Sequence, residues 1–128
     1  MTVRTLEWRT LVIISVAVCL SGAARSAERL SLSVSPAIAV APADLVVKAT
    51  IEVSPANRAI EVVAESSDFY RSSEMPLDGA RAPRVARFRF RSLPGGAYVV
   101  TARLKGSGDE LLAETRQQVQ VVASPLAR

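Results

Sequence analysis

The stretch Leu93-Pro94-Gly95-Gly96-Ala97-Tyr98-Val99-Val100 decides the fold class of this chain. Apolar and polar residues alternate before it, from Val85 to Phe90, and again after it as far as Leu104. Alternation with period two is typical of strands that bury one face. Pro94 fixes φ, and the two glycines permit a positive φ where the chain reverses. The stretch therefore predicts a corner between two antiparallel strands.

Short alternating segments continue on both sides of this corner, separated by Pro, Gly, Asn and Asp. That spacing predicts an all-β protein, an antiparallel sandwich of about seven strands with no helix. One apolar face comprises Leu45, Val47, Ala49, Ile51 and Val53. Residues 66–82 form the least regular part, with a short strand at 69–71. A bulge near Glu114 would bring the two halves of the last strand, 111–122, onto one face.

The N-terminal segment has the pattern of a secretory signal peptide. Arg4 and Arg9 precede an uncharged apolar run at 11–20, and small residues follow at 21–27. The run is shorter than the roughly 20 residues of a spanning helix. We expect a signal peptide at 1–27, a domain at 28–123, a tail at 124–128, and a periplasmic or secreted location. Cleavage after Ala24 or after Ser26 fits equally; an uncleaved anchor or a lipid on Cys19 stays open.

Removal of such a leader limits the chemistry of the mature chain. Trp8 and Cys19 leave with it, and the sequence contains no His. The mature chain then has no disulfide, imidazole base or thiolate. Loss of Arg4, Arg9, Arg25 and Glu7 lowers the formal net charge from +4 to about +2, too small to favour nucleic acid. We expect no catalysis, no cofactor and no metal site.

The passage Phe88-x-Phe90-x-x-Leu93-Pro94-Gly95-x-x-Tyr98-x-Val100 resembles the passage between strands E and F of immunoglobulin-like and fibronectin type III-like domains. The resemblance implies a β-sandwich in which the Tyr98 ring packs in the core and its hydroxyl bonds back to the corner. Pro94, Gly95, Gly96 and Tyr98 would then be the structural corner. The mature chain lacks the disulfide and core tryptophan of antibody-type domains, so a transthyretin-like or carboxypeptidase regulatory-like sandwich stays open. Residues 72–79 also resemble a pattern in bacterial secreted proteins.

The densest charge cluster lies along the strand that precedes the corner. Arg87, Arg89 and Arg91 share one face, opposite Phe88 and Phe90. This face is a candidate surface for an acidic protein, an anionic glycan or a lipid headgroup. The alternative is a solvated face whose arginines pair across strands with residues such as Glu52.

Other candidate sites are weaker. Phe69 and Tyr70 are adjacent, so a strand there turns one ring outward, and we expect Tyr70 to be the exposed aromatic. The remaining chemical candidates are two lysines and two carboxylate sets: Lys48 and Lys105 for a serine–lysine dyad, Glu61 with Glu65 for glycoside chemistry, and Asp68, Glu74 and Asp78 for calcium.

These patterns favour an exported, non-catalytic binding or assembly module whose partner is another envelope or extracellular protein. Contact would run through an edge strand, at 30–34 or near Phe69, or through the arginine face. The alternatives are a carbohydrate-binding accessory domain and a purely structural envelope protein. Membrane contact is expected only through the leader or a lipid on Cys19.

Overall fold

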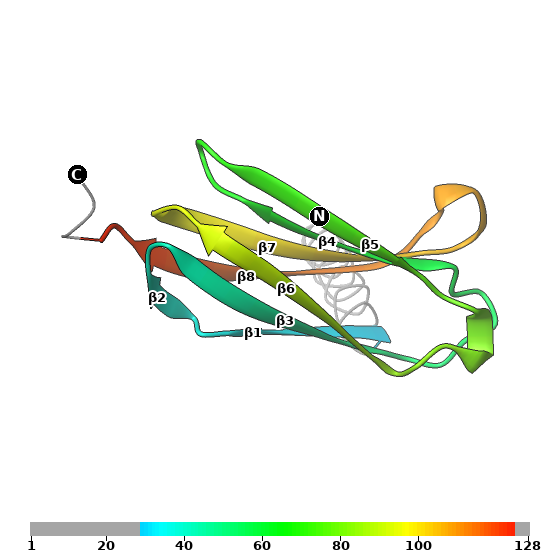
Figure 1. Cartoon of the computed structure of the whole chain (residues 1–128). Coiled ribbons are helices and arrows are strands. Elements are labelled where there is room, and N and C mark those ends of the chain that lie inside the picture. Colours follow the sequence, from blue (N-terminus) through cyan, green and yellow to red (C-terminus); the bar gives the residue numbers. More distant parts are fainter. Residues whose placement is uncertain (1–28, 125–128) are drawn as a thin grey trace, which may run out of the picture.

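The computed structural model describes residues 29–124, so the expected signal peptide and Cys19 lie outside the described residues. The described part is all-β, with two sheets packed face to face (Figure 1). The three-stranded sheet has the order β1 (Leu30–Ser35), β3 (Ala43–Ile51), β6 (Val85–Leu93). The five-stranded sheet has the order β2 (Ile38–Val40), β8 (Leu111–Val122), β7 (Gly96–Lys105), β4 (Ala59–Glu65), β5 (Tyr70–Pro76). Within residues 29–124, no helix is long and apolar enough to cross a bilayer.

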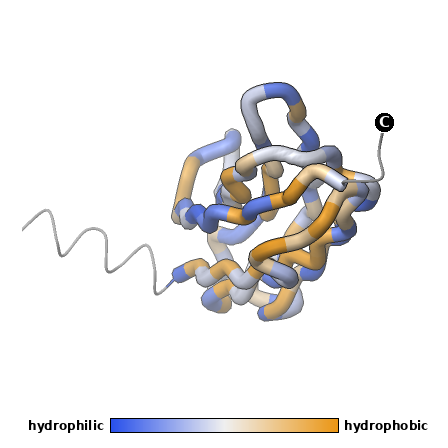
Figure 2. Tube along the Cα trace, turned by 90° about the vertical axis from the view of Figure 1, so that its left-hand side faces the viewer, coloured by the Kyte–Doolittle hydropathy of each residue, from blue (hydrophilic) through white to orange (hydrophobic). Residues whose placement is uncertain are grey.

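Alternating side chains build the core between the sheets, and the alternation is visible along the chain trace (Figure 2). Every second residue of β3 is buried from Ala43 to Ile51. Phe88 and Phe90 of β6 lie beside them in the same sheet, with 7% and 2% of their surface exposed. Burying side chains of this size contributes about 1.5–3 kcal/mol each, which offsets the entropy of ordering the strands. The prediction for Val53 is wrong: β3 ends at Ile51, and Val53 lies in the following turn, 45% exposed.

The chain changes sheets between its first two strands. β1 pairs antiparallel with β3, whereas β2 pairs in parallel with β8. The bonds Ser35–Pro36 and Ala41–Pro42, on either side of β2, are both cis. Because β2 and β8 are parallel, the expectation of a purely antiparallel sandwich is wrong. β2 keeps the direction of β1 after it crosses, and β8 runs the same way.

The region expected to be irregular contains a regular strand. β5 pairs with β4 over the whole of Tyr70–Pro76. Sequence alternation misses it because most of its side chains are exposed on both faces. Contrary to the expectation of no helix, residues 30–124 contain two short 3₁₀ turns, Gly79–Arg81 and Ser107–Asp109.

The last strand carries the expected bulge at another position. Leu104 pairs with Ala113, but Lys105 pairs with Leu111, so Leu112 is the extra residue. This shift leaves Ala113, Val119 and Val121 on the buried face. The bulge lies beside Gly106, where an added Cβ would come within 3.2 Å of the Leu112 side chain. The close packing of this hairpin decides where the register changes.

Candidate functional site

The corner between β6 and β7 is built around a buried tyrosine. Tyr98 is 1% exposed, and its hydroxyl donates a hydrogen bond to the Pro94 carbonyl oxygen at 2.6 Å. The expectation of positive φ at the two glycines is wrong, because in this corner only Ser92 has a positive φ, of 57°. Gly95 instead permits a close approach: a Cβ there would lie 3.1 Å from the Ala123 Cα. The corner is therefore a packing feature.

A bulge immediately before the corner orients the end of β6. Ala43 pairs with Leu93 and Leu45 with Phe90, so two residues of β6 oppose Asp44. The Asp44 carboxylate accepts a hydrogen bond from the Ser92 backbone N–H at 3.0 Å. The extra residue lets Phe90 and Leu93 both point into the core, although they are three positions apart.

Four cations gather on the outer face of the three-stranded sheet, and we call this surface the cationic face. It consists of Lys48 from β3 and three alternating residues of β6: Arg87, Arg89 and Arg91. All four are exposed. The β6 arginines point outward because Ala86, Phe88 and Phe90 occupy the core side of the same strand.

Cross-strand register places no carboxylate of β3 opposite Arg87 or Arg89, while Asp44 lies across the bulge from Arg91. Lys48 lies directly opposite Arg87, and Val46 lies opposite Arg89. Among residues 29–124, no carboxylate forms an ion pair with any of the four cations. The alternative in which Glu52 pairs with them is wrong in register, since β3 ends at Ile51 and Glu52 follows it at the far end of the sheet. Like charges directly opposite each other destabilise a sheet.

The outer face of the five-stranded sheet shows the opposite arrangement. Arg103 contacts Glu61 at 3.3 Å and Glu114 at 3.0 Å, and Lys105 lies 3.7 Å from Glu61. Arg116 also pairs with Glu114, at 2.9 Å. The hydrogen bond from Arg103 is the main cause that lowers the pKa of Glu114, and the same bond raises the pKa of Arg103. Within residues 29–124, the cations on the outer face of the five-stranded sheet therefore form ion pairs, whereas those of the cationic face do not.

Of the adjacent aromatic residues Phe69 and Tyr70, Tyr70 is the exposed one, as predicted. Tyr70 is 60% exposed, whereas Phe69 packs edge-on against Tyr98 with ring centroids 6.3 Å apart. The Arg71 guanidinium lies 5.1 Å from the Phe69 ring centre and donates from Nη1 to the Arg91 carbonyl oxygen at 2.7 Å. Tyr70 is thus available to a ligand, while Phe69 is covered by Arg71.

The structure places the lysine and carboxylate candidates in different surroundings. Lys48 is exposed, as expected, but Lys105 is more enclosed than predicted, with 18% of its side chain accessible beside Glu61. Glu61 forms ion pairs with Arg103 and Lys105. No group of three potential metal ligands, His, Cys, Asp or Glu, comes together in the described part.

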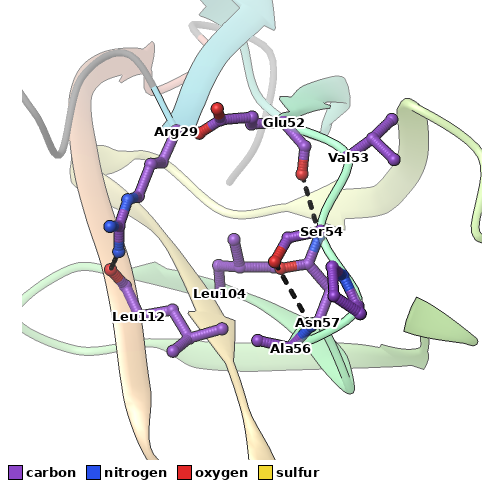
Figure 3. A pocket seen from close by; sticks show the side chains of 9 residues that line it. Arg29, Glu52, Val53, Ser54, Ala56, Asn57, Leu104 and Leu112 are labelled. Atoms are coloured by element: carbon purple, nitrogen blue, oxygen red, sulfur yellow. Dashed lines mark hydrogen bonds between the residues drawn. The ribbon is translucent and has the colours of Figure 1, made fainter. Parts of the chain in front are cut away.

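A pocket of about 300 Å³ lies at the end of the sandwich where β1 begins (Figure 3). Sequence alone carries no signal for this pocket, because its lining residues come from separate segments: the start of β1, residues 52–57 and the β7–β8 hairpin. Its polar groups largely bind backbone: Arg29 donates to the Leu112 carbonyl at 3.5 Å, and Asn57 donates to the Glu52 carbonyl at 2.9 Å. These contacts close the end of the domain.

Comparison with protein-family models and with curated proteins finds no match to this chain. Solved structures do share the fold. Two variants of superoxide reductase (neelaredoxin) from Ignicoccus hospitalis are each 15% identical, with TM-scores of 0.58 and 0.59; the alignments cover 72% and 76% of this chain and 78% and 84% of theirs. The sulfur carrier protein SoxY from Chlorobium limicola f thiosulfatophilum is 14% identical, with a TM-score of 0.53, over 73% of this chain and 79% of that chain.

A family 76 glycoside hydrolase from a bovine Bacteroides thetaiotaomicron strain is also similar, with 14% identity and a TM-score of 0.52. The match covers 72% of this chain but 20% of that enzyme. At such identities the likeness shows the fold alone, an all-β architecture that proteins of different activity share.

Proposed function

We propose that this chain is an exported, non-catalytic binding or assembly module that contacts another envelope or extracellular protein through its cationic face. The single observation that carries the proposal is the opposition of Lys48 and Arg87 without a compensating carboxylate. A merely solvated face has no need of this arrangement, and the same molecule pairs its cations on the other sheet. An acidic partner surface would supply the missing charge.

Export and the finer fold assignment belong to the same proposal. The leader pattern at 1–27 supports export, and the Tyr98–Pro94 hydrogen bond supports an immunoglobulin-like sandwich. The separation of β1, β3 and β6 from β4, β7 and β8 agrees with that assignment. The enzyme names among the structural neighbours transfer no activity to this chain, because at 14–15% identity the likeness shows the fold alone.

Capture from envelope extract tests the proposal. The variant Arg87→Glu/Arg89→Glu reverses two charges, and the matched control Arg58→Glu/Arg81→Glu reverses two exposed arginines that form no ion pair among residues 29–124. We expect wild type and control to retain a partner at low salt, and the cationic-face variant to lose it. Partner capture that resists both charge reversal and high salt would contradict the electrostatic contact.

A second candidate, a carbohydrate-binding accessory domain, draws support from the 60% exposure of Tyr70. An exposed ring next to a sheet face can stack on a sugar. A glycan array with wild type and Tyr70→Ala tests it: a signal that disappears in the variant supports the candidate, and no signal in wild type removes it. Failure of both tests leaves the purely structural envelope protein.

A further inference from the structure

β6 is one of the two edge strands of the three-stranded sheet. The other edge strand, β1, is followed at Pro36 by the crossing to β2, which joins the opposite sheet. β6 pairs with β3 on one side, and among residues 29–124 no strand pairs with its other side. This edge extends over Val85–Leu93 and contains no proline. The Arg71 side chain bonds it at the Arg91 carbonyl, and Val85–Arg89 stays open to pairing with a further strand.

Hydrogen-bond alternation identifies which residues face the open edge. The Ile51 N–H donates to the Arg84 carbonyl at 2.7 Å, so Arg84 turns its carbonyl toward β3. In an antiparallel pair this orientation recurs at every second residue. Val85, Arg87 and Arg89 therefore turn their backbone N–H and C=O groups outward. The Arg91 carbonyl fits this parity, because it points away from β3 and accepts the hydrogen bond from Arg71.

The last strand of the opposite sheet, β5, is covered by β6 only in part. Arg71, Ser73 and Met75 lie on the core side of β5, since they pair with Ala64, Val62 and Ile60, which are buried. Yet Arg71 and Ser73 are exposed and Met75 is only half-buried. A strand added beside β6 would occupy the position that covers them.

We propose that β6 accepts an extended partner segment with acidic residues at alternate positions, antiparallel to Val85–Arg89. This inference rests on the proposed function and specifies its partner. Side chains directly opposite Arg87 and Arg89 would lie on the cationic face, about 5.5 Å away between Cα atoms, where a carboxylate meets each guanidinium. The intervening residues would face Met75 and Phe69 and are expected to be apolar. A second copy of β6 does not fit, because antiparallel self-pairing sets arginine beside arginine.

Binding of short peptides tests the segment. The probe is acetyl-Ser-Glu-Val-Glu-Val-Glu-Ser-amide, and a matched peptide carries N-methyl groups on its glutamates, which removes the N–H donors but keeps the charge. We expect fluorescence anisotropy to show binding of the first peptide only. Amide hydrogen exchange should slow at Arg87 and Arg89, whose N–H groups face the edge, and stay unchanged at Phe88, which is already bonded to β3.

Protein variants complete the test. Arg87→Gln/Arg89→Gln should weaken peptide binding about tenfold, while Arg58→Gln/Arg81→Gln, with the same net charge, should change it less than about twofold. Equal binding of the N-methylated peptide, or unaltered exchange at Arg87 and Arg89, would refute strand addition while leaving the anionic partner in place. If polyglutamate and both peptides all fail to bind at low salt, the proposed electrostatic contact falls as well.

Discussion

The Tyr98 hydroxyl lies 2.6 Å from the Pro94 carbonyl oxygen and donates a hydrogen bond to it inside the corner between β6 and β7. Tyr98→Phe deletes only this donor, so the variant leaves a carbonyl short of its partner without emptying the core. We expect the free energy of unfolding to fall by about 1–3 kcal/mol, measured by urea denaturation. Tyr70→Phe is the matched control, because the Tyr70 side chain is exposed. Equal effects in the two variants would mean that the corner bond does not stabilise the fold.

Backbone strain at Ser92 gives a second prediction. Ser92 adopts a φ of 57°, which glycine tolerates and β-branched residues resist. Ser92→Gly should retain the bond from its N–H to Asp44 and change stability by less than about 1 kcal/mol. Ser92→Val should lose more than about 1 kcal/mol. Thermal or urea unfolding of both variants decides, and a Val variant as stable as the Gly variant would show that this position relaxes freely.

Sequence alone predicts those parts of the fold that bury one face. The alternation around Phe88, Phe90 and Tyr98 marks two core strands correctly because the core selects apolar residues at every second position. β5 lacks that selection, since the opposite sheet does not cover it, and its pattern therefore carries no strand signal. The exact positions of the bulges, at Leu112 and opposite Asp44, depend on contacts between strands, so the sequence of one strand does not predict them.

The candidate site was predictable only in part, for the same reason. Alternation places Arg87, Arg89 and Arg91 on one outward face, but it does not name their neighbours across the sheet. The register of β6 against β3 is set by pairing between segments more than thirty residues apart. That register puts Lys48, and not Glu52, opposite Arg87, and so leaves Arg87 and Arg89 without an opposing carboxylate on β3.

Acid should weaken the charge network on the five-stranded sheet. The bond from Arg103 lowers the pKa of Glu114 below its ordinary value of 4.5 in the folded state. Its stabilisation is therefore present above pH 4.5 and is lost as the pH falls through the lower folded-state pKa. We expect Glu114→Gln to be less stable than wild type at neutral pH, and the difference to shrink below pH 4.5. A constant difference in melting temperature across this window would contradict the assignment.

Charge repulsion on the cationic face should make binding and stability change in opposite directions. Arg87→Glu places a carboxylate directly opposite Lys48, replacing a like-charge pair by an ion pair. The free energy of unfolding at low salt should rise by about 0.5–1 kcal/mol, and added salt should reduce the gain. Partner binding should fall in the same variant.

The double variant Lys48→Glu/Arg87→Glu restores a like-charge pair of the opposite sign and should cancel the gain in stability without restoring binding. This cycle separates the two roles of the arginine, since a residue kept for stability would lose stability on reversal. A less stable Arg87→Glu variant would mean that Arg87 already has a stabilising partner, and the case for an uncompensated binding face would fail with it.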